Sequence, residues 1–103
     1  MVQYSPTVDR TFAALADPTR RAVFERLGGG SATISELAEP FGISLTGMKK
    51  HVQILEDAGL VTTEKVGRTR RCSLAPRPLA QVEAWMHRLD RFEALLERTK
   101  GAA

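Results

Sequence analysis

The sequence predicts a mainly α-helical fold with one small β-hairpin, in the order α-α-α-α-β-β-α. Two observations support this fold class. Apolar residues recur every three or four positions along most of the chain, the spacing that places them on one face of a helix. One stretch rich in threonine, valine and charged residues interrupts this pattern around a central glycine, which is typical of a β-hairpin.

The first two helices are expected before residue 30. Apolar residues at i, i+4 and i+7 predict a helix over about 6–15; they are Val8, Phe12 and Leu15. Asp17 and Pro18 suit the N-cap and first position of a second helix, because the carboxylate accepts free backbone N–H groups and proline has no such group. Three consecutive glycines at 28–30 then end that helix.

The next two helices form a predicted helix-turn-helix. Thr33 and Glu36 have the spacing of a capping box and start a short third helix. A glycine-containing turn at 42–43 follows, and Ser44 suits the N-cap of a fourth helix over 44–58. A short helix, a tight turn and a longer helix in this order are the elements of a helix-turn-helix.

A hairpin and a long final helix complete the prediction. Residues 60–74 form the hairpin, with its tip near Gly67. In the final helix, apolar residues step by 3, 4, 3 and 4, the heptad pattern of a helix that packs along another helix. These seam residues are Val82, Trp85, Leu89, Phe92 and Leu96.

A basic hairpin after a helix-turn-helix predicts a single winged helix-turn-helix domain over residues 1–103. The 103 residues, 43% hydrophobic and 26% charged, suffice for one compact core and leave no room for a second. We expect the core and wing to occupy 8–75 and a C-terminal dimerisation helix to occupy 77–98.

The positive charge of the chain is concentrated in one stretch. Residues 44–71 hold six basic and three acidic side chains, a net charge of +3, whereas the nine basic and nine acidic residues elsewhere cancel. A basic zone on a nearly neutral body is typical of a protein that binds a polyanion. Charge alone leaves a solvated surface as the alternative.

The fourth helix divides into two sides when its residues are placed at about 100° per position. Met48, Val52 and Leu55 fall on one side and are expected to hold the helix to the body. The opposite side carries polar and basic residues, and its carboxylates come only in the last turn. Since the first turns of a recognition helix approach the bases, this distribution favours insertion into the major groove.

Side-chain chemistry then predicts the DNA contacts. Lysine donates to guanine or phosphate, glutamine pairs with adenine or a phosphate, and apolar groups contact thymine methyls. A helix start suits a phosphate, and wing arginines suit the flanking backbone or minor groove. The predicted contacts are Ser44, Leu45, Thr46, Lys49, Lys50, Gln53, Arg68, Arg70 and Arg71. Strand alternation points Arg70 and Arg71 to opposite faces, so at most one of them is expected to face DNA directly.

Four phrases resemble the ArsR family of bacterial winged-helix repressors over roughly residues 8–98: "FAALADPTRRAVFERL", "ISELAEPFGIS", "VQILEDAGLV" and "GRTRR". The resemblance implies a symmetric homodimer built from the first and last helices, binding to a palindromic operator in double-stranded DNA, and repression of the protein's own operon. The family positions that match Leu45, Thr46, Lys49 and Lys50 face DNA. The dimer contacts expected here are Phe12, Val82, Trp85, Leu89, Phe92 and Leu96.

No sensor site is evident. Many relatives bind metals through cysteines where this chain has Thr33, Ser35 and Ala38, so that site is absent. A second family site uses the last helix, where Glu83, His87 and Asp90 could offer a partial ligand set; the alternative is a solvated polar stripe, and we expect no metal and no cofactor. A small-molecule effector is not identifiable.

Cys72 has two interpretations. Nearby arginines could lower the pKa of its thiol and make it a redox switch, or it could be a small packed residue of the wing sheet. The wing departs from the family here, because relatives often carry bulky aliphatic and aromatic residues in place of Arg70, Arg71 and Cys72.

Other classes of protein fit the sequence less well. Neither a glycine-rich phosphate loop nor a nucleophile elbow is present, so no enzyme is expected. No apolar run is long enough for a membrane span, and we expect no secretory signal at the N-terminus. The single cysteine suits the reducing cytoplasm. A winged helix that only binds another protein is the remaining alternative.

Overall fold

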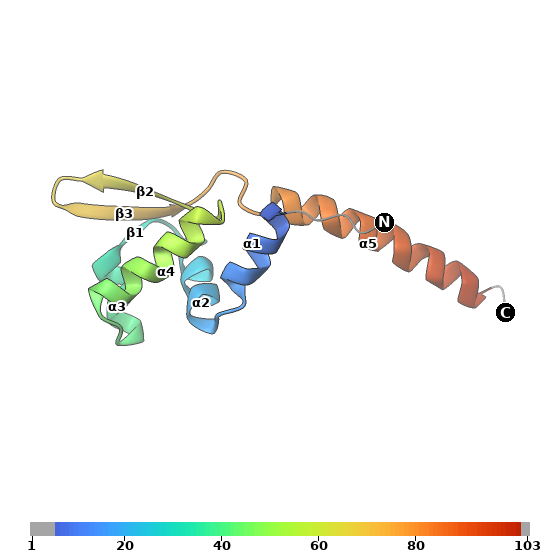
Figure 1. The fold of residues 1–103 in the computed structure, drawn as a ribbon, viewed down its shortest axis with the longest axis horizontal. Helices are drawn as coiled ribbons and strands as arrows, with labels where there is room; N and C mark the ends of the chain where they lie inside the picture. Colours follow the sequence, from blue (N-terminus) through green and yellow to red (C-terminus); the bar gives the residue numbers. More distant parts are fainter. Residues whose placement is uncertain (1–5, 102–103) are drawn as a thin grey trace.

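Five helices and three short strands make up the computed structural model, which describes residues 6–101 and, at 92, 96, 99 and 100, the backbone alone. The elements are α1 (Pro6–Leu15), α2 (Pro18–Leu27), β1 (Ala32–Thr33), α3 (Ile34–Phe41), α4 (Leu45–Asp57), β2 (Val61–Val66), β3 (Thr69–Leu74) and α5 (Ala80–Gly101). Helices α1 to α4 form one body, the hairpin extends from one end, and α5 projects from the other (Figure 1).

The predicted fold class is confirmed, with one strand added. Strand β1 pairs antiparallel with β3, Ala32 opposite Cys72 and Thr33 opposite Arg71, so the sheet order is β1-β3-β2. The element order is therefore α-α-β-α-α-β-β-α, which corrects the prediction. A two-residue strand is too short to show the alternation by which strands are found in a sequence.

The corner between α1 and α2 is held by side chains of the Asp17-Pro18-Thr19-Arg20 phrase. The Asp17 carboxylate accepts the backbone N–H of Arg20 at 3.0 Å and caps α2, as predicted. The Arg20 guanidinium donates to the carbonyls of Ala14, at 2.6 Å, and Ala13. The bond to Ala14 satisfies a carbonyl that the end of α1 leaves unpaired, whereas the Ala13 carbonyl also accepts the backbone N–H of Ala16.

This cap makes stability depend on pH in the acid range. The backbone N–H of Arg20 lowers the pKa of Asp17 below its ordinary value of 3.8. Since the folded pKa is the lower one, the carboxylate stabilises the fold fully above pH 3.8, and this contribution is lost as pH falls through the folded pKa.

Asp17→Asn keeps an N-cap oxygen but has no carboxylate to titrate. We expect the free energy of unfolding of this variant, measured by urea titration, to fall less steeply with decreasing pH than that of the wild type. Equal pH slopes in variant and wild type would contradict this.

Two caps position the helix-turn-helix. Thr33 and Glu36 form the predicted capping box at the start of α3. Gly42 ends α3 with φ of 63°, a left-handed conformation that glycine adopts without steric cost. The Ser44 hydroxyl accepts the backbone N–H of Gly47 at 3.0 Å and starts α4. The third and fourth helices therefore meet at the turn that the sequence predicts.

The core lies between α1–α4 and the sheet. Its largest fully buried side chains are Leu37, Met48, Leu55, Leu60, Val23, Val61 and Cys72. They join one cluster that continues from the helices into the base of the hairpin. The body can therefore fold around its own core, and α5 adds little to that core beyond Val82.

Helix α5 gives the chain an extended shape. It begins at Ala80 and continues to Gly101, whereas the sequence predicted 77–98; the first turn starts after Pro78. The longest dimension is 63 Å and the Cα radius of gyration is 17.5 Å, against about 13 Å for a compact domain of this length. None of the helices described is both long and apolar enough to span a membrane.

Candidate nucleic-acid interface

Helix α4 exposes one face and buries the other. Met48, Val52 and Leu55 are buried, as predicted. All the predicted contact residues of this helix and its cap are exposed; they are Ser44, Leu45, Thr46, Lys49, Lys50 and Gln53. The first acidic residue of α4 is Glu56. The exposed face is thus free of carboxylates through its first turns.

The predicted contacts of α4 differ in what surrounds them. Leu45 and Lys49 lie on the side facing the hairpin, where they line a cavity. The Gln53 amide nitrogen donates to the Asp57 carboxylate at 2.8 Å. Binding of a base through this amide group would require the bond to Asp57 to be exchanged. Gln53 is therefore less available than its exposure suggests.

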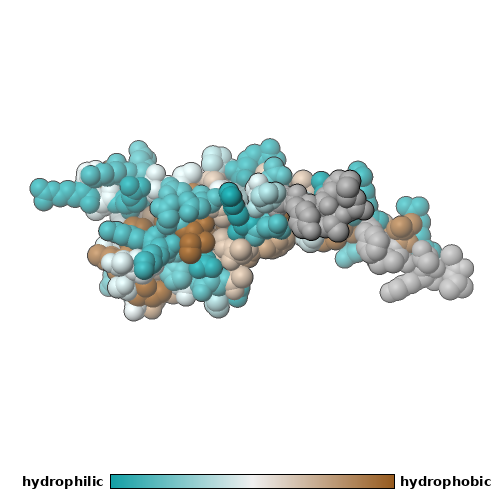
Figure 2. Space-filling view, viewed as in Figure 1, coloured by the Kyte–Doolittle hydropathy of each residue, from teal (hydrophilic) through white to brown (hydrophobic). Residues whose placement is uncertain are grey.

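The hairpin, residues 61–74, is the wing. A two-residue turn, Gly67-Arg68, joins its strands, and Gly67 has φ of 63°. Positive φ at the first turn position alone is the pattern of a type II′ turn, which matches the twist of paired strands. Hydrophilic side chains cover the wing at the left end of Figure 2. The turn thus carries Arg68 to the tip.

The predicted separation of Arg70 and Arg71 is confirmed. Arg70 donates to the Thr63 hydroxyl at 2.7 Å, on the face of the wing that looks toward α4. Arg71 donates to the Ser31 hydroxyl at 2.9 Å. Successive residues of a strand point to opposite faces of its sheet, so of these two arginines only Arg70 contributes charge to the space between the wing and α4.

A hydrogen-bond chain that the sequence did not reveal joins α4 to the wing. Glu56 accepts the backbone N–H of Thr63 at 3.1 Å and its hydroxyl at 2.7 Å. The same hydroxyl oxygen accepts from Arg70. Glu56 therefore positions the wing, a role that depends on a tertiary contact and has no local sequence signal.

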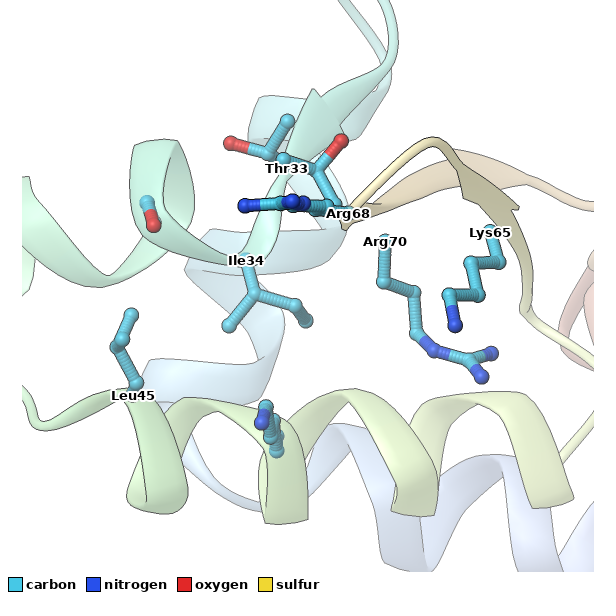
Figure 3. A pocket seen from close by; sticks show the side chains of 9 residues that line it. Thr33, Ile34, Leu45, Lys65, Arg68 and Arg70 are labelled. Atoms are coloured by element: carbon cyan, nitrogen blue, oxygen red, sulfur yellow. The ribbon is translucent and has the colours of Figure 1, made fainter.

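The wing and the helix-turn-helix enclose a cavity of about 340 Å³, which we call the wing hollow. It is lined by Thr33, Ile34, Ser35, Leu45, Lys49, Lys65, Arg68, Thr69 and Arg70. Four of these nine residues are basic and none is acidic. In Figure 3, Lys65 and Arg70 both point from the wing toward α4. The hollow is a cationic recess beside the exposed face of α4.

The predicted dimer contacts belong to α1 and α5, two helices that pack against each other. Phe12 and Trp85 are 46% and 37% exposed and contact each other edge to face, with ring centroids 5.5 Å apart. Leu89 is exposed and Val82 is buried. Met86 and Leu95, also exposed, widen this apolar surface. The side chains of Phe92 and Leu96 lie outside the described residues.

Among the described residues, no group of three or more His, Cys, Asp or Glu side chains could hold a metal ion. Glu83, His87 and Asp90 are exposed on α5. Their polar stripe therefore supplies no assembled ligand set within one chain.

Cys72 is a fully buried free cysteine opposite Thr63 and Ala32 in the sheet. Burial raises the pKa of its thiol, Glu56 raises it further, and Arg70 opposes them less strongly. This packing favours the structural interpretation.

We expect the Cys72 thiol of the native protein to react with a disulfide reagent at neutral pH far more slowly than the same thiol in the urea-unfolded chain. Equal rates would restore the redox interpretation.

Known proteins share this architecture and sequence. A family model described as a helix-turn-helix domain matches residues 15–64. The HTH-type transcriptional regulator Rv2034 of Mycobacterium tuberculosis is 39% identical over 84 residues, covering 82% of this chain and 76% of that protein. The transcriptional repressor SdpR of Bacillus subtilis is 33% identical over 79 residues, covering 77% and 88%.

A solved structure supports the same assignment. The crystal structure of an ArsR family transcriptional regulator aligns with a TM-score of 0.81 and 46% identity, over 91% of this chain and 97% of that one. With the buried and exposed faces of α4 and the cationic wing beside it, these similarities show that the chain is a DNA-binding regulator. It belongs to the ArsR family of winged helix-turn-helix transcriptional regulators.

Proposed function

We propose that the protein is a homodimeric autorepressor that binds a palindromic operator, with α4 in the major groove. The observation that carries this proposal is the exposed face of α4, where Lys49 and Lys50 precede any carboxylate and Lys49 lines the hollow beside the cationic wing. A chain of this class acts at the chromosome, and we place it in the cytoplasm. Its function includes no catalytic step.

Each side chain has a proposed role. Thr46 and Lys50 read base edges, Lys49 reads a base or holds a phosphate, and Leu45 contacts a thymine methyl. The N-terminus of α4 with Ser44 binds a backbone phosphate. Gln53 contacts DNA if its amide group gives up the hydrogen bond to Asp57 and donates to the DNA instead. Arg68 contacts the flanking backbone or minor groove, Arg70 faces the DNA side, and Arg71 lies outside the interface.

The dimer is proposed from the shape and the exposed apolar surface. The radius of gyration exceeds that of a compact domain, and large apolar side chains of α1 and α5 remain exposed in the single chain. A second copy would cover them, with the heptad seam extending through Phe92 and Leu96. We propose that 8–75 bind DNA and 77–98 dimerise. A twofold dimer reads two related half-sites, hence the palindrome.

Repression and autoregulation are inferred from the family. The relative in Bacillus subtilis is named a transcriptional repressor. A repressor that binds across its own promoter limits its own concentration without a sensor. This arrangement suits a chain whose described residues assemble no metal site.

A protection footprint on the DNA upstream of the protein's own gene tests this proposal. We expect saturable protection over an inverted repeat that overlaps the promoter. If protected sites are found elsewhere in the genome but not upstream of this gene, autoregulation is excluded. An absence of saturable binding to any double-stranded DNA would favour the protein-interaction alternative.

A further inference from the structure

We propose that the wing hollow is a binding site for a phosphate group, and that a free phosphorylated small molecule can occupy it in competition with DNA. The regulatory part of this inference rests on the proposed function, whereas the site itself does not. A phosphate of the operator backbone and a phosphorylated metabolite would both present a phosphate group to this site.

The charges that line the hollow call for an anion. Lys49 approaches from α4, and Lys65, Arg68 and Arg70 approach from the wing. Like charges around one recess repel one another, and none of the nine lining residues carries a compensating carboxylate. A bound phosphate would relieve this repulsion, and its oxygens could also accept from the hydroxyl of Ser35. The hydroxyls of Thr33 and Thr69 already donate to the Glu36 carboxylate and the Val66 carbonyl.

Arg70 is oriented for this role before any ligand arrives. One guanidinium nitrogen donates to Thr63 at 2.7 Å, and Thr63 in turn donates to Glu56 at 2.7 Å. Both Glu56 and Arg70 also line an adjoining cavity of about 260 Å³. The carboxylate therefore fixes Arg70 through the Thr63 hydroxyl, and the remaining N–H groups form the planar fork that suits phosphate oxygens.

The position of the hollow explains why both sources can reach it. Helix α4 is proposed to enter the major groove and the wing tip to reach the flanking minor groove, and one backbone strand separates these grooves. That strand must cross the space between α4 and the wing, which is the wing hollow (Figure 3). Its volume of about 340 Å³ lies in the range of small-molecule sites.

Calorimetric titration of the DNA-free protein with pyrophosphate tests the site. We expect saturable binding of one pyrophosphate per protomer, weakened about tenfold or more in Arg70→Gln because this substitution removes a charge-assisted bond. Arg71→Gln is the matched control: it removes the same charge from the next residue, on the opposite face of the wing. Its affinity should stay within about twofold of wild type.

Two results would overturn the proposal: no saturable binding at millimolar pyrophosphate, or equal weakening in Arg70→Gln and Arg71→Gln. If circular dichroism shows that Arg70→Gln is not folded, Lys65→Gln decides instead, since it removes a lining cation and leaves the Thr63 bond intact. No DNA is present, so the site can be confirmed even if the proposed operator binding fails.

Operator DNA then identifies the source. Neutral methylphosphonates are placed singly along the operator. If a methylphosphonate at one position per half-site weakens binding by the wild type but causes no further weakening in Arg70→Gln, the hollow binds that phosphate of the DNA backbone. If pyrophosphate displaces operator from the wild type and from Arg71→Gln, but displaces less from Arg70→Gln, a free anion competes with DNA for the hollow. Pyrophosphate that binds without displacing operator would overturn the competition.

Discussion

Replacement of Lys49 and Lys50 by alanine is expected to weaken operator binding by about 1–3 kcal/mol for each lysine that reads a base. Both side chains are exposed on α4, and neither belongs to the buried core. The free energy of unfolding should therefore change little. Fluorescence anisotropy titration at fixed salt measures the affinity, and urea denaturation measures the stability.

A second variant separates recognition from net charge. Arg91→Ala with Arg98→Ala removes the same two charges from exposed positions of α5. This control should lower affinity only through the general electrostatic attraction to DNA. Wild-type affinity of the lysine variant, or equal weakening in both variants, would contradict the assignment of α4 as the recognition helix.

Trp85→Asp is expected to dissociate the dimer and, with it, high-affinity binding. Trp85 contributes a large, partly exposed ring beside Phe12, and buried aromatic anchors of interfaces typically contribute about 2 kcal/mol or more. The dimer dissociation constant should therefore rise by about 30-fold or more. A monomer engages only one half-site, so operator affinity falls as well. Sedimentation equilibrium measures the first effect.

The matched control introduces the same carboxylate elsewhere on α5. Ala94 is exposed and lies roughly opposite the heptad residues at 100° per position. Ala94→Asp should leave the dimer intact. A wild-type protein that sediments as a monomer at micromolar concentration would show that the apolar surface of α1 and α5 has another role.

Local patterns in the sequence predicted the helices well because the causes of each helix are local. The cap at Asp17, the box at Thr33 and the cap at Ser44 each involve a backbone N–H three residues away. The buried side of α4 follows from helical periodicity in the same way. Alternation along β3 also sufficed to separate Arg70 from Arg71.

Tertiary contacts could not be predicted. Glu56 looked like a carboxylate placed away from DNA, yet it accepts two bonds from Thr63. The His51 ring nitrogen Nδ1 lies 3.4 Å from the Arg20 guanidinium and 4.0 Å from the Asp17 carboxylate. These pairs belong to different elements, and their approach depends on how the helices and the sheet pack. The wing hollow has the same origin.

The predicted seam illustrates a third case. Heptad spacing in α5 indicated that a helix packs there. In the part of the chain that the structure describes, α1 packs against α5, yet Trp85 and Leu89 stay partly exposed. Periodicity reports that a face is apolar without saying which copy of the chain covers it.

A hydroxyl-radical footprint on the operator tests most directly whether two copies of α4 read one duplex. We expect two protected segments related by a twofold axis, with centres one turn of DNA, about 10–10.5 base pairs, or a whole number of turns apart. A single unsymmetrical segment, or a spacing that places the two segments on different faces of the duplex, would contradict the twofold arrangement.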